Sequence, residues 1–225
     1  MLPLVLRGGF IGSLNLGSCD ANRYAASSSA DFLERLAALS AVCLDSALAT
    51  ERIKQSGLVD GLTAVNNRRY FEQRCLEEVT AAQRSGQPLV CLMLDVDHFK
   101  KINDSSGHPA GDAVLRHVAR LIKEQLRIND VVARYGGEEF VVLLPATTLD
   151  AGLATAERIR QRLAGQSIPV GVQELVRVTI SIGAAELPSA SRSQPAAMLM
   201  ADLIARADEA LYRAKDGGRN RVVTG

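Results

Sequence analysis

Two adjacent carboxylates, Glu138 and Glu139, directly follow two glycines in the polar stretch from Arg134 to Phe140. Apolar residues flank this stretch on both sides, so its polar centre is predicted to form the turn of a β-hairpin. Adjacent glycines permit positive φ angles and let other groups approach the backbone closely. Neighbouring carboxylates repel each other unless a cation lies nearby. The pattern therefore indicates a metal-binding turn, and a solvated acidic turn is the alternative.

A second carboxylate, Asp95, follows the continuous apolar run from Leu89 to Leu94. Such a run, bounded by turn signals, predicts a strand that is buried on both faces. A carboxylate just beyond the end of a central strand is a common functional group. Asp95 and Glu138 are suitable ligands for Mg²⁺, and adjacent strands at a spacing of ~5 Å would bring them together. His98, three residues further on, is expected to be a surface residue rather than a ligand.

The elements that must position these groups alternate between helix and strand. This alternation, together with one hairpin, predicts an α/β sandwich with a mixed sheet. Amphipathic helices are expected at about 68–84, from 112 to about 126, at 148–163 and at 196–215, with strands at 168–171 and 175–185 and a loop at 189–195.

The N-terminal part reads as a separate piece. Residues 4–16 predict two short strands around a turn at Arg7 to Gly9, and two strands do not make a stable domain alone. A helix is expected from about Asp31 to Gln55, with Ser28 as its cap. Its apolar stripe predicts either a dimerising coiled coil or packing against its own domain remnant. The stripe consists of Phe32, Leu36, Leu39, Cys43 and Ser46 or Ala47.

The composition is that of an ordinary globular protein. The 225 residues are 47% hydrophobic and 23% charged, with a net charge of +1, which argues against a nucleic acid polymer or an anionic membrane as partner. No apolar run is long enough for a membrane span, and the N-terminus lacks a signal peptide pattern. The four cysteines, at positions 19, 43, 75 and 91, have no metal-ligand spacing. We expect buried, reduced thiols in a cytoplasmic protein.

Five spaced motifs resemble those of the GGDEF family, the diguanylate cyclases, over about residues 58–223. One departure is that Ala64 and Val65 stand where the family usually has Gly and Leu. The motifs lie at Asp60 to Arg69, Asp95 to Asp104, Gly107 to Asp112, Gly136 to Phe140 and Ala207 to Asn220. The resemblance implies a ferredoxin-like domain with a mixed, mostly antiparallel sheet, similar to nucleotide cyclase and polymerase palm domains. The first two strands are similar to the last strands of a GAF-type sensory domain. The expected domains are therefore a remnant at 1–29, a signalling helix at 30–57 and the cyclase at 58–225.

The implied reaction joins two GTP molecules into cyclic di-3′,5′-guanylate (c-di-GMP) and two pyrophosphates. By resemblance, Asp95, the carbonyl of Val96 and Glu138 hold Mg²⁺ or Mn²⁺. Glu138 is the favoured base for the 3′ hydroxyl, and Glu139 is the runner-up. Because a carboxylate bound to a metal is a poor base, the assignment of the base remains open.

The substrate-binding residues are implied in the same way. Asp112, assisted by Asn103 and beside His108, matches the positions that read guanine, whose N1–H and N2–H donors suit a carboxylate. Each of Asn103 and Asp112 could instead cap the following helix. The nucleotide is expected to lie against the backbone of the two glycines. The triphosphate and glycine positions are Lys100, Lys215, Arg219, Gly136 and Gly137.

Arg127 and Asp130 have the Arg-x-x-Asp spacing of the family's product-inhibition site, and Arg158 matches the arginine that completes it. Without the hairpin nearby, this pair would read as a surface ion pair. Since each domain is implied to hold one GTP, a homodimer is required for catalysis. The alternatives are a catalytically silent receptor that binds c-di-GMP through Arg127 and Asp130, and a cyclase acting on ATP, which Asp112 disfavours.

Overall fold

The chain divides into two compact units, Met1–Gly57 and Leu58–Gly225. The computed structural model describes residues 2–6, 9–15, 17, 19, 31–171, 175–188 and 194–225, without the side chains of 46–56. The predicted turn at Arg7 and Gly8, the Ser28 cap and most of the 189–195 loop lie outside the described residues. In the described parts, no helix is both long and apolar enough to cross a membrane.

The smaller unit pairs strand β1 (Leu2–Leu6) with β2 (Gly9–Leu14) in an antiparallel hairpin, followed by helix α1 (Asp31–Ser56). Ala37 and Ala41 of α1 are buried together with Leu4 of β1. Two members of the predicted apolar stripe lie away from this contact, because Phe32 is 73% exposed and Leu39 is 65% exposed. The side chains of Ser46 and Ala47, also assigned to the stripe, lie outside the described residues. The helix thus packs on the hairpin through small residues and leaves the larger apolar side chains uncovered.

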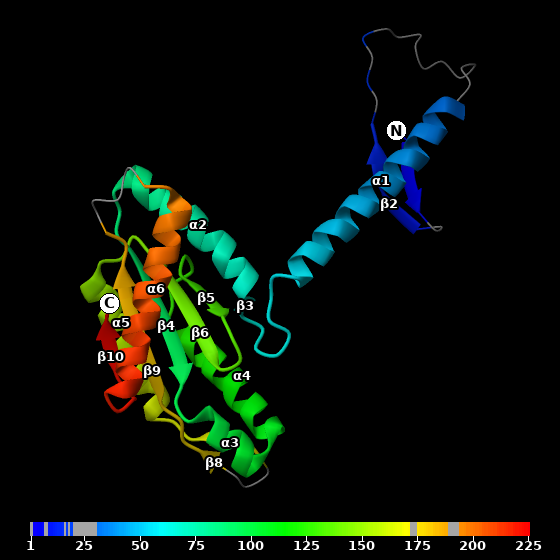
Figure 1. Cartoon of the computed structure of the whole chain (residues 1–225). Helices are drawn as coiled ribbons and strands as arrows, with labels where there is room; N and C mark the ends of the chain where they lie inside the picture. The colour runs from blue at the N-terminus through cyan, green and yellow to red at the C-terminus, as the bar shows by residue number, and fades with distance from the viewer. Residues whose placement is uncertain are drawn as a thin grey trace. The chain divides into compact units, whose positions relative to one another are not determined.

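The larger unit is built on a six-stranded sheet with the order β10-β9-β4-β6-β5-β3. The central pairs β9–β4, β4–β6 and β6–β5 are antiparallel, and the edge pairs β10–β9 and β3–β5 are parallel. The predicted mixed, mostly antiparallel α/β sandwich is confirmed (Figure 1). The elements are β3 (Asn66–Asn67), α2 (Arg68–Ser85), β4 (Leu89–Val96), α3 (Phe99–Ser106), α4 (His108–Glu124), β5 (Val131–Arg134), β6 (Glu139–Pro145), α5 (Leu149–Ala164), β7 (Ile168–Pro169), β8 (Leu175–Val176), β9 (Ile180–Glu186), α6 (Ala196–Asp216) and β10 (Val222–Thr224).

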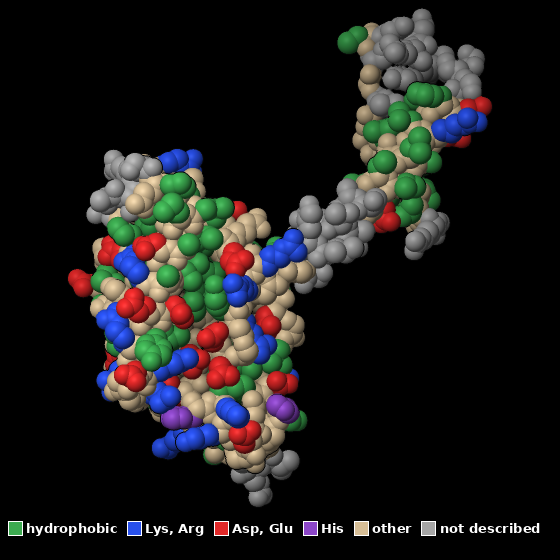
Figure 2. Space-filling model, in the orientation of Figure 1, with side chains coloured by type: hydrophobic (Ala, Val, Ile, Leu, Met, Phe, Trp, Pro, Cys, Tyr) green, Lys and Arg blue, Asp and Glu red, His purple; other side chains and the backbone are tan. Residues whose placement is uncertain are grey.

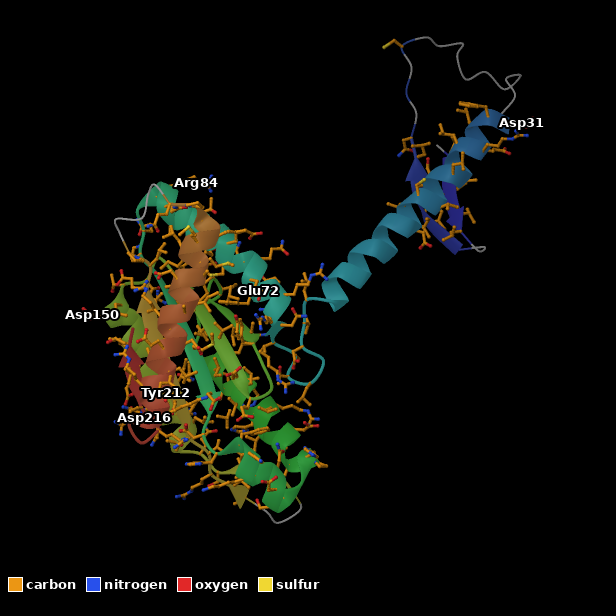
Figure 3. The ribbon with its side chains drawn as sticks, viewed as in Figure 1. Asp31, Glu72, Arg84, Asp150, Tyr212 and Asp216 are labelled. Atoms are coloured by element: carbon orange, nitrogen blue, oxygen red, sulfur yellow. The ribbon has the colours of Figure 1, made fainter. Side chains whose placement is uncertain are left out.

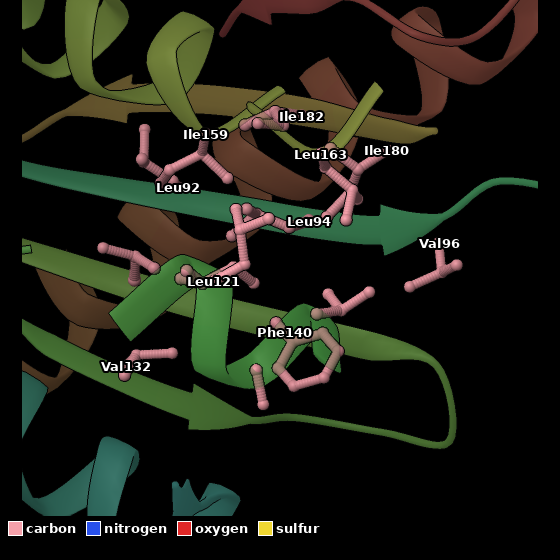
Figure 4. Packing of buried hydrophobic residues seen from close by; sticks show 14 of the residues in the cluster. Leu92, Leu94, Val96, Leu121, Val132, Phe140, Ile159, Leu163, Ile180 and Ile182 are labelled. Carbon is pink, nitrogen blue, oxygen red and sulfur yellow. The ribbon is translucent and has the colours of Figure 1, made fainter. Parts of the chain in front are cut away.

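Strand β4 is buried along its whole length, because helices cover both faces of the sheet. Alternate residues of β4 enter different cores, as the pleat requires. Leu92 and Leu94 join the cluster that includes residues of α4 and α5 (Figure 4). Cys91 and Met93 join the cluster that includes residues of α2 and α6. The strand that ends at Asp95 and Val96 is therefore held rigidly from both sides.

Several short elements differ from the expectations. The strand expected at 175–185 is split into β8 and β9, which belong to different sheets. Helix α3 and the edge strands β3 and β10 were not anticipated, since each is too short for a periodic pattern. Cys75 and Cys91 are buried as expected, but the expectation is wrong for Cys19 and Cys43, which are exposed. Cys43 lies on a face of α1 that the hairpin does not cover.

Candidate active site

The polar stretch between β5 and β6 forms a hairpin turn whose far strand pairs with β4. In this register, Asp95 lies opposite Glu139, and the amide of Val96 donates to the carbonyl oxygen of Glu138 at 3.3 Å. Asp95 and Glu138, which are 43 positions apart, are thus brought to the same end of the sheet by antiparallel pairing. On its other side Asp95 lies opposite Ser181 of β9.

Burial makes this cluster of carboxylates electrostatically unfavourable by itself. The side chain of Asp95 is only 10% exposed, and burial raises its pKa even though the Lys215 ammonium lies 2.7 Å away. The pKa of Glu138 is also raised, first by burial and then by the Asp95 carboxylate. An additional cation placed between these carboxylates would stabilise their charged forms.

Lys215 reaches Asp95 because α6 crosses the sheet at very short range. A Cβ atom on Gly183 of β9 would lie 2.1 Å from the carbonyl oxygen of Ala207 in α6, so only glycine permits this crossing. Lys215 is in the last turn of α6, near the labelled Tyr212 and Asp216 (Figure 3). Arg219 follows in an exposed turn with a φ of 61°.

The hairpin turn is tied to the beginning of the larger unit. Arg134 donates from Nη2 to the carbonyl oxygen of Gly137 at 2.6 Å and from Nη1 to the Asp60 carboxylate at 3.3 Å. Burial raises the pKa of Asp60, but hydrogen bonds from Thr63 and the charge of Arg134 outweigh it and lower the pKa overall. Asp60 therefore stays charged and holds the arginine.

The two glycines of the turn have different surroundings, and neither uses the positive φ that glycine permits. Neither Gly136 nor Gly137 has a positive φ. At Gly136 a Cβ atom would lie 2.5 Å from Oε2 of Glu139, whereas at Gly137 nothing lies within 4 Å. Close approach by Glu139 accounts for Gly136, and Gly137 leaves open space beside the backbone.

Asn103 and Asp112, predicted to read guanine, come from helices α3 and α4, which meet at Gly111. A Cβ atom on Gly111 would lie 2.0 Å from Oδ1 of Asn103, so the missing side chain lets Asn103 contact α4 beside Asp112. The capping alternative is wrong: Asn103 lies inside α3, and α4 starts at His108 after Gly107. His108, Lys100 and His98 are exposed around these helices.

The residues of the predicted product site lie near the end of α4. The amide of Arg127 donates to Oδ2 of Asp130 at 2.8 Å, which closes a tight turn. Arg158 of α5 donates to the carbonyl oxygen of Gln125 at 2.7 Å. Asp130 lines a cavity of about 450 Å³, and Arg158 lines a separate one of about 480 Å³. The three residues thus lie on neighbouring segments, and Asp130 and Arg158 line two different cavities.

The buried carboxylate of Asp97 was not predicted as a site residue. Asp97 is 3% exposed and accepts hydrogen bonds from Thr179, Ser181 and the amide of Asn220. The second Asp of the Asp-x-Asp pattern was its only signal. The face of the larger unit that Figure 2 shows carries interspersed acidic and basic side chains, in keeping with the net charge.

The donor set at the end of the sheet fits a divalent cation. Asp95, Glu138 and the carbonyl of Val96 offer three oxygen ligands, the type that Mg²⁺ and Mn²⁺ take. Among the described residues, no group of three or more His, Cys, Asp or Glu side chains is placed to hold a metal. A cation here therefore needs the backbone, water or substrate oxygens to complete its coordination.

One protein family matches most of the chain. The family described as "Diguanylate cyclase, GGDEF domain" matches residues 57–221. The chain belongs to the GGDEF family. The predicted family is thereby confirmed, and diguanylate cyclases of this family generally use a divalent metal. The relation of the N-terminal unit to GAF domains stays a prediction.

Individual GGDEF proteins extend this comparison. The response regulator PleD of Caulobacter vibrioides is 42% identical over 167 residues, which make up 74% of this chain and 36% of that protein. Diguanylate cyclase A of Treponema denticola is 36% identical over an alignment of 229 residues. This alignment covers 98% of this chain and 58% of that protein. The chain thus spans less than two thirds of either relative.

A solved structure gives the same assignment. The coiled coil and GGDEF domain of DgcB from Caulobacter crescentus, in complex with c-di-GMP, matches with a TM-score of 0.77 and 30% identity. The match covers 87% of this chain and all 100% of that one. The GGDEF fold of the larger unit is therefore shown by both sequence and structure.

Proposed function

We propose that this chain is a diguanylate cyclase, which condenses two GTP molecules into c-di-GMP and two pyrophosphates. The observation that carries the proposal is the meeting of Asp95, Glu138 and Lys215 at one end of the sheet. Two carboxylates and an ammonium group in a partly buried site suit the binding of a metal–triphosphate complex. The names of the related diguanylate cyclases support the same reaction.

Each group has a role in this proposal. Asp112 accepts hydrogen bonds from guanine N1–H and N2–H, and Asn103 assists from the adjoining helix. Lys215 and Arg219 bind phosphate oxygens at the end of α6, and Lys100 does so from the first turn of α3. The open space at Gly137 and the small Gly136 let the nucleotide lie against the hairpin backbone.

Asp95, Glu138 and the carbonyl of Val96 would hold Mg²⁺ or Mn²⁺. When bound, the metal lowers the pKa of the 3′ hydroxyl and offsets charge on the phosphates. Burial and the nearby Asp95 raise the pKa of Glu138, which brings its affinity for a proton closer to that of a useful base. Glu138 is accordingly our first choice as the group that takes the 3′ proton, and Glu139 is the second.

The decisive experiment incubates the chain with GTP and Mg²⁺ and separates the nucleotides by anion exchange. We expect c-di-GMP and pyrophosphate from GTP, and no cyclic product from ATP. The Asp112→Asn variant should use GTP less well, because an amide cannot accept both guanine donors. If GTP gives no cyclic product with Mg²⁺ or with Mn²⁺, a catalytically silent receptor for c-di-GMP is favoured. Turnover of ATP would favour a cyclase that acts on ATP.

Product inhibition is a further part of the proposal, carried by Arg127, Asp130 and Arg158. Binding of c-di-GMP there would replace the contact between Arg158 and Gln125 with contacts to the ligand. Calorimetry with c-di-GMP should show weaker binding to Arg158→Ala. The control is Arg84→Ala, which changes an exposed arginine in the last turn of α2, on another helix. Equal binding by both variants would contradict this site.

Dimerisation is proposed because each site holds one of the two GTP molecules. The exposed Phe32 and Leu39 of α1 lie seven positions apart, the spacing of a coiled-coil seam. Sedimentation of Leu39→Arg should show fewer dimers than the wild type, with a matching loss of activity per chain. A Glu34→Arg variant of the same helix is the control for charge alone. An unchanged dimer fraction in Leu39→Arg would contradict the role of α1.

A further inference from the structure

The buried carboxyl group of Asp97 connects three segments that surround the candidate active site. Its Oδ1 accepts from the Ser181 hydroxyl at 2.6 Å, and its Oδ2 accepts from the Thr179 hydroxyl at 2.6 Å. Oδ2 also accepts from the backbone amide of Asn220 at 3.0 Å. Both oxygens of Asp97 are thus directed at hydroxyl and amide donors of the chain itself, at 3% exposure.

The segment that Asp97 holds is the turn after α6, which has an unusual backbone. Arg219 and Asn220 have φ angles of 61° and 44°, in the left-handed region that residues with a Cβ atom rarely adopt. Such a conformation costs free energy and persists only where surrounding contacts hold it. The amide bond to Asp97 is one such contact, and the bond from the Arg219 amide to the Ala214 carbonyl oxygen at 3.0 Å is another.

Arg160 of α5 also holds this turn. Its Nη1 donates to Oδ1 of Asn220 at 2.7 Å and to the carbonyl oxygen of Asn220 at 3.3 Å. The guanidinium is itself oriented by Glu157 at 2.6 Å. Asn220 is therefore hydrogen-bonded at its backbone amide, its carbonyl oxygen and its side chain, whereas the adjacent Arg219 is exposed.

We propose that Asp97 is a positioning residue that shapes the turn at Asn220, so that Arg219 is presented in advance to the phosphates of the nucleotide. Arg160 supports the same turn from α5. The inference rests on the proposed function for the identity of the nucleotide. Its physical basis is preorganisation: a turn already held in a costly conformation loses little freedom when the ligand binds.

The first test concerns the turn alone and needs no nucleotide. Amide hydrogen exchange of Asn220, followed by NMR in the full chain, should be slow in the wild type and at least about tenfold faster in Asp97→Ala. Asp97→Asn should stay near the wild type, because its amide oxygen still accepts from Thr179 and Asn220 while its NH₂ group donates to Ser181. Unchanged exchange in Asp97→Ala overturns the inference.

The second test measures the affinity for a non-hydrolysable GTP analogue and for GMP, both in EDTA. Asp97→Ala should lose about tenfold in affinity for the analogue and less than about twofold for GMP, which lacks the outer phosphates. Asp97→Asn should keep most of the affinity. Equal losses for both ligands would indicate a general structural role, and an Asn variant as weak as the Ala variant would indicate a need for the charge. Either result overturns the inference.

A second variant covers the case in which Asp97→Ala does not fold. Arg160→Ala removes the contacts to the carbonyl oxygen and the side chain of Asn220 and should shift both measurements in the same direction by a smaller factor. Arg162→Ala, on the same helix, is the matched control and should shift neither. No shift in Arg160→Ala would overturn the part of the inference that concerns α5. If the wild type makes no c-di-GMP from GTP, the proposed function fails, while the exchange test still decides the role of Asp97.

Discussion

The Lys215 ammonium lies 2.7 Å from the Asp95 carboxylate, although the two residues are 120 positions apart. The contact depends on Gly183, which lets α6 cross β9 at short range. A lysine in the last turn of a helix would also be explained by the helix dipole. The short contact with a buried carboxylate gives Lys215 a second role that the dipole does not require.

The Lys215→Met variant separates these two roles. We expect its KM for GTP to rise by about tenfold or more, since a charge-assisted contact to phosphate is lost. Lys123→Met is the matched control, because Lys123 is exposed and occupies the last turn of α4. Steady-state kinetics and thermal melts of both variants give the answer. If both variants lose the same small amount of stability and keep the wild-type KM for GTP, the interaction with the helix dipole is the only role of Lys215.

The Glu138→Gln variant should be inactive yet more stable at neutral pH. Burial and the Asp95 carboxylate raise the pKa of Glu138 above its ordinary value of 4.5 in the folded chain. Such a group binds its proton more tightly when folded, so the free energy of unfolding falls as the pH rises through the folded pKa. Replacing the carboxylate removes this penalty.

The measurement is a thermal melt in EDTA at pH 8 and at pH 4.5. The gain in melting temperature should be present at pH 8 and should shrink toward pH 4.5 as the wild-type carboxyl becomes protonated. Glu124→Gln is the control, because Glu124 pairs with Arg120 at 2.6 Å and loses a favourable contact. A lower melting temperature for Glu138→Gln at pH 8 would contradict the raised pKa.

Ala64 has a φ of 57°, although the family usually has glycine at this position. The Ala64→Gly variant should raise the free energy of unfolding by about 0.5–1 kcal/mol, because glycine adopts this conformation without the steric cost. Ala81→Gly inside α2 should lower it by a similar amount. Urea denaturation of both variants tests the opposite signs. Destabilisation by Ala64→Gly would show that the turn is not strained.

Gly111→Ala should loosen the junction of α3 and α4. The added Cβ atom would lie 2.0 Å from Oδ1 of Asn103 and 3.0 Å from Cζ of Phe99. We expect a loss of about 1–3 kcal/mol in the free energy of unfolding and a higher KM for GTP, since Asn103 must move. Helix propensity alone predicts the opposite sign. Gly61→Ala, with nothing within 4 Å of the new atom, is the control. A stabilised Gly111→Ala variant would contradict the close contact.

The long helices and the hairpin were predictable because their signals are local. The apolar run before Asp95 indicates a strand buried on both faces, and β4 is covered by two separate clusters. The glycines between Tyr135 and Glu138 indicate a turn, which lies between β5 and β6. Edge strands β3 and β10 were not predictable, since segments of two and three residues become strands only through their neighbours.

The candidate site was likewise predictable only in part. By itself, the sequence determined which residue types are present, their spacing and hence the family, because these are properties of the chain as written. Only the tertiary structure decided that Lys215 meets Asp95, that Asn103 contacts α4 at Gly111 and that Asp97 holds the turn at Asn220. Burial and proximity between segments more than a hundred positions apart, such as Asp97 and Asn220, arise only when the helices pack on the sheet, and no local pattern records them.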